Sequence, residues 1–379
     1  MPRAERPATA EACAELLRTC AAERHTVRVR GGGTKDHRVT RRDTDVVLET
    51  AALGGIVDHV PEDLTVTVRS GTPLASLREA LRAHGQFLPI DPPHVGRGAT
   101  VGGIIAANSD GFGRYRYGGI RDLLLGIRAA LPDGTVARAG GRVVKNVAGY
   151  DLNKLFIGSL GTLGVIVEAT FKILPIPPVV RAASATFASA GAAFGAADAI
   201  VRTSLRPIAV VVERTADRHW RLVLAAAGEA APVERAMAEL ARAAGTGGVA
   251  PETHDDAEVV LGPLRELVDD GTPGSVVRVA VPLSAQALFA EAAVRSDRDA
   301  RIVADAASGI VLVELREEGA VDGLLAAARV LGGNGRIERT MVARVDAASP
   351  EPPGAFLMRR LKDAFDPTGI LEPGRSVLG

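Results

Sequence analysis

Three glycine-rich segments, each beside a run that predicts a β-strand, constrain the fold of this chain more than any other feature. They are Arg30-Gly-Gly-Gly-Thr-Lys35, the stretch Ala99–Ser109 around a Gly-Gly pair, and Gly158-Ser-Leu-Gly-Thr-Leu-Gly164. Glycine lets the backbone approach a neighbouring group closely and leaves N–H groups free to bind an anion. Three such loops in order predict one extended, phosphate-bearing ligand that is held at several points.

A Rossmann dinucleotide site is the first alternative, and the glycine spacing argues against it. That fold places G-x-G-x-x-G between a strand and a helix. Gly158-x-x-Gly-x-x-Gly164 has a different spacing and precedes a strand, and no helix is predicted directly after Gly31–Gly33. We therefore exclude nicotinamide binding by that fold. A second alternative stays open, in which the glycines serve only close packing within tight turns.

Five motifs occur in the same order as in the vanillyl-alcohol-oxidase/PCMH flavoproteins, and the chain resembles that family. The likeness extends over Val27–Pro175 and the C-terminal tail, whereas the middle of the chain is similar only in architecture. Within the family, the motifs are most similar to those of the FAD-binding E-type subunits of glycolate oxidases. The motifs are Arg30-Gly-Gly-Gly-Thr-Lys35, Asp91-Pro-Pro-His-Val-Gly-Arg-Gly-Ala-Thr-Val-Gly-Gly103, Val144-Lys-Asn-Val-Ala-Gly-Tyr-Asp-Leu152, Gly158-Ser-Leu-Gly-Thr-Leu-Gly-Val165 and Asp366-Pro-Thr-Gly-Ile-Leu-Glu-Pro-Gly-Arg375.

The resemblance implies that the chain binds one FAD. The first glycine loop would lie at the FAD pyrophosphate, where Arg30, Lys35, His37 and Arg38 would form a positive collar. The other two loops would line the pyrophosphate, ribityl and isoalloxazine parts. The residues expected to contact FAD are Arg30, Gly31, Gly32, Gly33, Thr34, Lys35, Pro92, Thr100, Val101, Gly102, Gly103, Ala107, Asn108, Tyr117, Gly158, Gly161, Thr162, Gly164, Val165 and Ile166.

The attachment of the flavin is expected to be non-covalent. Family members with covalent flavin use a His or Cys in these loops, whereas here Thr34 follows the first glycines. No cysteine occurs after Cys20. We therefore expect a dissociable FAD.

Three residues are candidates for catalysis, and each has a structural alternative. His94 is the one histidine inside a motif, although a loop histidine also serves as a hydrogen-bonding anchor. Lys145 could favour negative charge on the flavin or on a bound carboxylate, while the neighbouring Tyr150-Asp151 pair could cap a turn. Arg375 lies where the family tail approaches the active site, or it is a solvated surface cation.

Differences from the family pattern bear on partners and metals. Self-sufficient 2-hydroxyacid dehydrogenases of the family carry paired histidines and an acid that hold a metal, whereas residues 179–342 contain only His219 and His254. We therefore expect no metal site. Glu372 and Arg375 replace the polar ends of the family's Asn-Pro-Gly-Lys, and Leu160 replaces an acid. These changes favour an E-type subunit that works beside a larger homologous flavin subunit and an iron–sulfur subunit.

Composition narrows the class of protein. A chain of 379 residues is long for one core and predicts two domains. Its 45 basic and 45 acidic residues cancel, which gives no support for nucleic acid or a membrane surface as the main partner. Cys13 and Cys20 lie two helical turns apart, too far for a disulfide, so both are expected to be buried thiols. Without a leader or an apolar span, the chain is expected to be cytoplasmic, attached to the inner face of a membrane only through partners.

The predicted fold class is α+β, with a PCMH/VAO-type FAD-binding domain over 1–177, a cap over 178–345 and a tail over 346–379 that returns to the first domain. The first domain is expected to contain helices Thr9–Glu23 and Pro73–His84, and strands Thr26–Arg30, Asp45–Glu49, Leu64–Arg69, Leu123–Leu131, Thr135–Arg138 and Val165–Ile173. The stretch Pro175-Ile-Pro-Pro178 is interpreted as a linker.

Two β-α-β-β-α units are predicted in the cap, forming one antiparallel, ferredoxin-like sheet with helices on one face. The elements are strand Ala182–Phe187, helix Ser189–Thr203, strands Ile208–Glu213 and Trp220–Ala227, helix Ala231–Ala244, strand Ser275–Val281, helix Ser284–Val294, strands Arg301–Ala304 and Ile310–Leu315, helix Val321–Leu331 and strand Gly335–Val342, followed in the tail by helix Phe356–Phe365.

The functional hypothesis is an FAD-dependent oxidoreductase subunit that supports oxidation of glycolate or a similar small D-2-hydroxyacid by hydride transfer to the flavin. Two alternatives stay open. One is a self-sufficient FAD oxidase or dehydrogenase acting on a 2-hydroxyacid or polyol, which a substrate-anchoring set of Arg, His and Tyr in the cap would favour. The other is a subunit whose FAD is structural.

Overall fold

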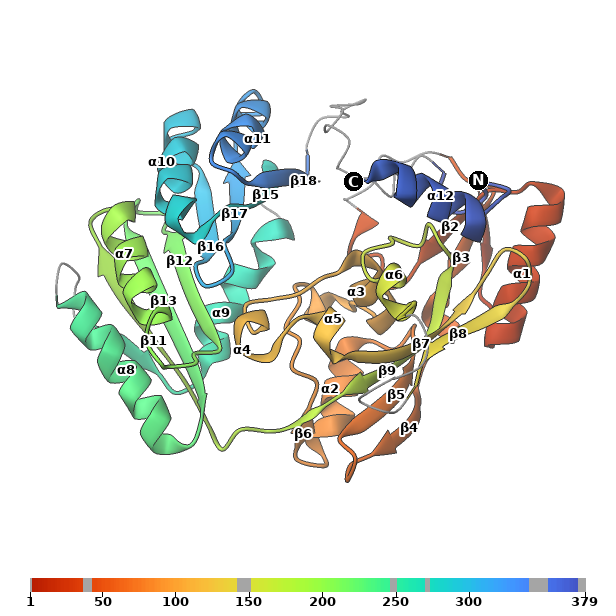
Figure 1. The fold of residues 1–379 in the computed structure, drawn as a ribbon, viewed down its shortest axis with the longest axis horizontal. Helices are drawn as coiled ribbons and strands as arrows, with labels where there is room; N and C mark the ends of the chain where they lie inside the picture. Colours follow the sequence, from red (N-terminus) through yellow and green to blue (C-terminus); the bar gives the residue numbers. More distant parts are fainter. Residues whose placement is uncertain are drawn as a thin grey trace. The chain divides into compact units, whose positions relative to one another are not determined.

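The computed structural model describes residues 2–36, 43–141, 151–245, 251–269, 273–340 and 354–373. The chain divides into two compact units. The first comprises Met1–Asp110, Gly118–Ile176 and Val345–Gly379, and the second comprises Gly111–Tyr117 and Pro177–Arg344. Each unit is built around its own sheets (Figure 1). None of the helices in the described ranges is long and apolar enough to cross a lipid bilayer.

The described part of the first unit contains a five-stranded antiparallel sheet in the order β4-β5-β9-β7-β8 and a three-stranded parallel sheet in the order β1-β3-β2. A two-residue pair, β6 with β10, lies beside them. The strands are β1 (Arg3–Glu5), β2 (Val27–Arg30), β3 (Val46–Glu49), β4 (Ile56–Val60), β5 (Thr65–Arg69), β6 (Gln86–Phe87), β7 (Leu124–Ala130), β8 (Val136–Gly140), β9 (Val165–Lys172) and β10 (Leu174–Pro175).

The two longer predicted helices of this unit bury one apolar face each. In α1 (Ala10–Glu23), the Thr9 hydroxyl accepts the Ala12 N–H at 3.0 Å and caps the helix. In α2 (Leu74–Arg82), the residues Leu74, Leu77 and Leu81 are fully buried and form the apolar face of the helix. The remaining helices are α3 (Val101–Ala107), α5 (Ile120–Leu123), α6 (Asn153–Phe156) and α12 (Ala355–Phe365).

The second unit is formed around an eight-stranded sheet in the order β14-β11-β13-β12-β16-β17-β15-β18, all antiparallel. The sheet order runs β11-β13-β12 in one half and β15-β17-β16 in the other, each read from the outside toward the central β12–β16 pair, so the two halves have the same strand order. The elements are α4 (Arg114–Tyr117), β11 (Val179–Phe187), α7 (Ala190–Val201), β12 (Ala209–Arg214), β13 (Trp220–Gly228), α8 (Ala230–Ala244), β14 (Glu252–His254), α9 (Ala257–Arg265), β15 (Ser275–Ala280), α10 (Gln286–Ser296), β16 (Arg301–Asp305), β17 (Ile310–Leu315), α11 (Ala320–Val330) and β18 (Asn334–Arg339).

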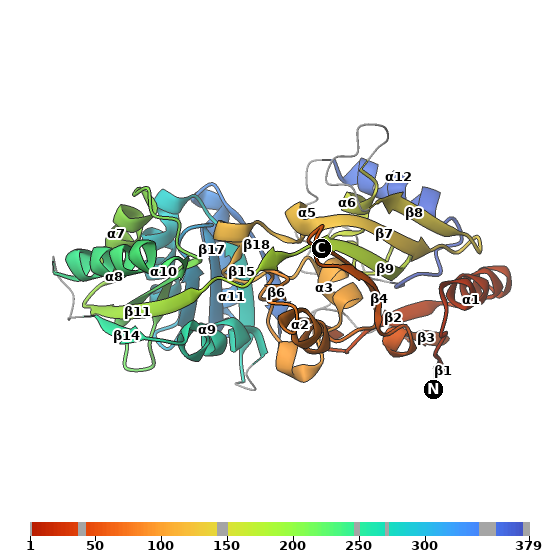
Figure 2. The ribbon, with the colours of Figure 1, turned by 90° about the horizontal axis from the view of Figure 1, so that it is seen from below.

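The four predicted cap helices lie on one face of the sheet, as expected, and a fifth helix, which was not predicted, lies on the other face. Four helices, α7, α8, α10 and α11, contribute to the core that contains Val210 and Val212. The helix α9 packs instead on the alternate side chains, which include Val211. Successive residues of a strand point to opposite faces, so α9 lies on the other side of the sheet. Figure 2 shows α9 and the helices α7, α8 and α10 on opposite sides.

Two further expectations change. The segment Ala99–Ser109, expected as one of three glycine-rich loops, contains the helix α3, because Thr100 adopts an extended N-cap conformation and Ile104 and Ile105 are buried. The predicted linker begins inside a strand, since Pro175 pairs with Gln86. The last cap strand is described as far as Arg339, and the residues that extend the predicted strand beyond 340 lie outside the described ranges.

Candidate functional site

The first glycine loop follows β2 and lies directly against the backbone before α3. A Cβ atom on Gly31 would come within 2.3 Å of the Thr100 Oγ1 atom, and one on Gly32 within 2.0 Å of the Gly98 carbonyl oxygen. Real Cβ atoms do not approach so closely, so both positions require glycine. The loop is thereby held as one wall of the site.

The second wall is α3, and two backbone N–H groups in its first turn are already hydrogen-bonded to carbonyl groups of the chain. The Val101 N–H donates to the Thr72 carbonyl at 3.0 Å, and the Gly102 N–H donates to the Ser70 carbonyl at 2.7 Å. The prediction that the N–H groups of this segment are free to bind an anion is therefore wrong for these two residues. The role of Gly102 is close packing, because a Cβ there would meet the Ser70 Cβ at 2.7 Å.

The third wall is the loop Gly158–Gly164, which is hydrogen-bonded to the last turn of α3. The Gly158 N–H donates to the Ile105 carbonyl at 3.0 Å, and the Leu160 N–H donates to the Ala106 carbonyl at 2.9 Å. Leu160 has a φ of 54° and Gly161 has a φ of 82°. A left-handed leucine is strained, which shows that packing and these hydrogen bonds fix the loop.

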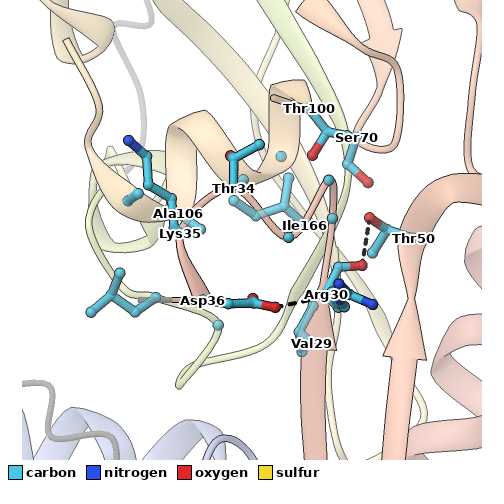
Figure 3. Close-up of a pocket in the computed structure, with 18 of the residues that line it drawn as sticks. Val29, Arg30, Thr34, Lys35, Asp36, Thr50, Ser70, Thr100, Ala106 and Ile166 are labelled. Carbon is cyan, nitrogen blue, oxygen red and sulfur yellow. Dashed lines mark hydrogen bonds and ion pairs between the residues drawn. The ribbon is translucent and has the colours of Figure 1, made fainter. Parts of the chain in front are cut away.

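The three walls enclose a cleft within the first unit, with about 730 Å³ of empty space including its mouth. Its lining residues are Val29, Arg30, Gly31, Gly32, Gly33, Thr34, Lys35, Asp36, Thr50, Ser70, Thr100, Gly102, Gly103, Ala106, Ala107, Leu160, Gly161, Gly164 and Ile166. Figure 3 shows their arrangement around the space.

Two hydroxyl groups in this lining are poised for a ligand. The Ser70 Oγ and Thr100 Oγ1 atoms are buried and have no hydrogen-bond partner in the described part of the chain. Their side chains lie next to each other at the cleft (Figure 3). A buried hydroxyl without a partner costs free energy, so these two atoms fit a polar ligand that supplies one. The polar, glycine-lined cleft thus fits a phosphate- and sugar-bearing group such as FAD.

The positive charge of Arg30 is largely compensated inside the site. Its Nε atom lies 3.3 Å from the Asp36 Oδ2 atom, and its Nη1 atom lies 3.8 Å from the Glu49 Oε1 atom. Figure 3 shows Arg30 turned toward Asp36. The predicted collar therefore has less net charge at Arg30 than the sequence suggests, and its members His37 and Arg38 lie outside the described residues.

Most of the predicted FAD contacts are brought together by this cleft. Those that line it are Arg30, Gly31, Gly32, Gly33, Thr34, Lys35, Thr100, Gly102, Gly103, Ala107, Gly161, Gly164 and Ile166. Those that do not are Pro92, Val101, Asn108, Gly158, Thr162 and Val165, and Tyr117 belongs to the second unit. Other lining residues were not predicted from the motifs, namely Val29, Asp36, Thr50, Ser70, Ala106 and Leu160.

Of the three catalytic candidates, His94 lies in the described part of the chain, and it does not line the cleft. His94 is completely buried in a left-handed conformation, and its carbonyl accepts the N–H groups of Arg97 and Ala99 at 3.1 Å each. That environment supports its structural role in the turn that leads into α3. Lys145 and Arg375 lie outside the described residues.

The C-terminal tail is hydrogen-bonded to β2, the strand that leads into the first glycine loop. The Val27 N–H donates to the Ile370 carbonyl at 2.8 Å, and the Glu372 N–H donates to the Val27 carbonyl at 2.8 Å. The Glu372 Oε1 atom then accepts the N–H of Val29 at 2.7 Å. The carboxylate that departs from the family motif is thus a buried backbone acceptor next to the first loop.

Comparisons with known proteins agree with this geometry. Residues 3–140 match the family described as "FAD binding domain", and residues 348–376 match "FAD linked oxidases, C-terminal domain". A solved structure of an alkyldihydroxyacetonephosphate synthase superposes on 98% of this chain and 77% of its own, with a TM-score of 0.75 and 17% sequence identity. That likeness establishes the fold.

Several curated proteins are related by sequence. Glycolate oxidase subunit GlcE of Escherichia coli is 46% identical over 134 residues, which is 35% of this chain and 38% of that protein. Glycolate oxidase subunit GlcD of Bacillus subtilis is 33% identical over 202 residues, 53% of this chain and 43% of the relative. The mitochondrial protein D-lactate dehydrogenase (cytochrome) 1 of Saccharomyces cerevisiae is 37% identical over 170 residues, which is 44% of this chain and 28% of that protein. The chain spans less than half the length of these relatives.

The fold, the cleft and the two domain matches define a flavoprotein of the FAD-linked oxidase type. The two domain matches and the related sequences agree with the resemblance of the motifs to the vanillyl-alcohol-oxidase/PCMH flavoproteins, and FAD is the cofactor that the matched domains indicate.

Proposed function

We propose that this chain is an FAD-dependent oxidoreductase subunit that supports oxidation of a small D-2-hydroxyacid such as glycolate. The observation that carries the proposal is the glycine-walled cleft with the buried, partnerless hydroxyls of Ser70 and Thr100. The similarity to glycolate oxidase subunits and to a D-lactate dehydrogenase supports the substrate class, because these names share 2-hydroxyacid chemistry.

The residues of the cleft bind and orient the cofactor. FAD, when bound, supplies the capacity to accept a hydride. Ser70 and Thr100 offer hydroxyl groups that can donate or accept hydrogen bonds. Gly31, Gly32 and Gly102 let the walls of the cleft pack directly against neighbouring segments of the chain, because a Cβ atom at any of the three would collide with Thr100, Gly98 or Ser70.

Attachment of FAD is proposed to be non-covalent. The described residues that line the cleft include no His, Cys or Tyr that could form a bond to the flavin. Binding then depends on hydrogen bonds and on contact with the glycine walls. Apo-protein should consequently be obtainable by mild removal of FAD and should bind it again.

A larger homologous flavin subunit and an iron–sulfur subunit are the proposed partners. The resemblance to E-type subunits and the names of the two glycolate oxidase subunits support this assembly. Electrons from the hydroxyacid would leave through those partners.

An anaerobic visible spectrum tests the proposal. The FAD-loaded chain is mixed with glycolate and then D-lactate, first alone and then with the two partner subunits. We expect the flavin band to stay oxidised in the chain alone and to bleach in the complex. Bleaching of the chain alone would favour a self-sufficient dehydrogenase. A complex that neither acid reduces would contradict the substrate class and favour a structural FAD.

A further inference from the structure

A lysine of the C-terminal helix α12 donates three hydrogen bonds, one of them to the third glycine loop. The Lys362 Nζ atom lies 2.5 Å from the Asp366 Oδ2 atom, 2.9 Å from the Thr162 carbonyl oxygen and 3.0 Å from the Leu371 carbonyl oxygen. An ammonium group has three donors and no acceptor. All three donors of Lys362 are therefore used.

Asp366 completes this arrangement. Its side chain has no exposed surface. The Oδ1 atom accepts the Ile370 N–H at 3.1 Å and the Oδ2 atom accepts the Leu371 N–H at 2.8 Å. The carboxylate thus shapes the turn that leads the tail onto β2, while Lys362 supplies its counter-charge. Removal of the partner of a buried carboxylate strongly destabilises the folded protein, because the buried charge is left without compensation.

The same lysine connects the tail to a wall of the FAD cleft. Thr162 lies between Gly161 and Gly164, both of which line the cleft. The loop is attached to α3 on one side through the N–H groups of Gly158 and Leu160. Lys362 holds it on the other side through the Thr162 carbonyl.

We propose that Lys362 is a positioning residue for the FAD cleft, which fixes the third glycine loop against the tail while the tail fixes β2. The inference rests on the proposed FAD binding and adds a residue that the motifs do not assign. Because Lys362 does not line the cleft, it acts through the loop backbone. Loss of the ammonium group should loosen the loop and weaken FAD binding, with the three walls otherwise intact.

The test compares Lys362→Met with Lys154→Met. Lys154 is a matched control, because its Nζ atom also donates to backbone carbonyls, those of Arg121 and Leu124, but these carbonyls belong to none of the three walls of the cleft. FAD affinity of the apo-chains is measured by calorimetry and by visible circular dichroism of bound flavin. We expect Lys362→Met to weaken FAD binding about tenfold or more with an altered flavin spectrum, and Lys154→Met to change it less than about twofold.

Restoring the ammonium group separates positioning from general damage. Lys362→Cys treated with bromoethylamine regains an amine of nearly the same length, and it should recover most of the affinity. The native Cys13 and Cys20 are buried and should resist the reagent. Lys362→Met that binds FAD as tightly as the wild type would overturn the proposal.

Hydrogen exchange of the wild-type chain keeps the inference testable even if Lys362→Met does not fold. FAD should slow exchange in residues 158–164 and in residues 366–371 together. Slowing in the loop without slowing in the turn would overturn the proposal. A wild-type chain that binds no FAD would refute the proposed function as well, whereas a chain that binds FAD but oxidises neither acid leaves the role of Lys362 to be decided by the affinities.

Discussion

At the residue scale, the two cysteines show how burial alone sets the chemistry of a side chain. Cys13 and Cys20 are both buried on the inner face of α1. Burial raises the pKa of the Cys13 thiol from 9.0 to about 12, and it also raises the pKa of Cys20. The expectation that both cysteines are buried and not joined by a disulfide is confirmed.

A dependence of stability on pH follows from Cys13. The unfolded chain ionises this thiol near pH 9.0, whereas the folded chain keeps it protonated up to about pH 12. The contribution of this group to stability is therefore complete below pH 9 and is lost as the pH rises toward 12, by up to about 1.4 kcal/mol per pH unit.

Urea unfolding of the wild type and of Cys13→Ala at about pH 7 and about pH 10 measures this effect. The substitution should lower the free energy of unfolding by about 1 kcal/mol at the lower pH and by less at the higher pH. The contributions of other titrating groups cancel, because the wild type and the variant share them. An equal cost at both pH values would contradict the assigned pKa.

Individual site residues differ in how far the sequence predicted them. The sequence predicted that the glycines at 31, 32 and 102 line the site, because they belong to glycine-rich segments next to predicted strands. Ser70 was missed, since it follows β5 outside any motif and only the fold brings it beside Thr100. The compensation of Arg30 by Glu49 could not be predicted either, because it depends on the pairing of β2 with β3.

At the scale of elements, α9 shows where periodicity fails. The pair Gly262-Pro263 is typical of a turn, and no element was predicted between Ala244 and Ser275. The helix nevertheless forms, with an N-cap at Asp256 whose side chain accepts the Glu258 N–H at 2.9 Å. Burial of Leu261 and its neighbours against the sheet outweighs the local preference.

The contribution of α9 can be measured with two substitutions on the same helix. Leu261 is 4% exposed and Val259 is 66% exposed. We expect Leu261→Ala to destabilise the second unit by about 3 kcal/mol, because it leaves a cavity, and Val259→Ala by less than about 0.5 kcal/mol. Fluorescence of Trp220, the single tryptophan of the chain, reports unfolding of this unit. Equal effects of the two substitutions would argue against α9 as a packed helix.

At the scale of the whole molecule, the order of the repeated cap elements was predictable and their spatial arrangement was not. The two like units of the cap follow from the sequence. The structure adds that they join through the β12–β16 pair and that their strands run in the same order outward from it. The segment Gly111–Tyr117 lies between motifs of the FAD-binding part, yet it groups with the second unit because Phe112 and Tyr115 pack against its cores. Such long-range packing leaves no local pattern.

The central claim is that the glycine-walled cleft binds FAD, and titration of the apo-chain with FAD tests it most directly. The comparison is between wild type, Gly32→Ala and Gly96→Ala. A Cβ on Gly32 would lie 2.0 Å from the Gly98 carbonyl oxygen, whereas one on Gly96 would meet nothing within 4 Å. We expect one FAD per chain for the wild type and for Gly96→Ala, and a loss of at least about a hundredfold in affinity for Gly32→Ala. Equal FAD binding by all three chains, or none by the wild type, would contradict the account.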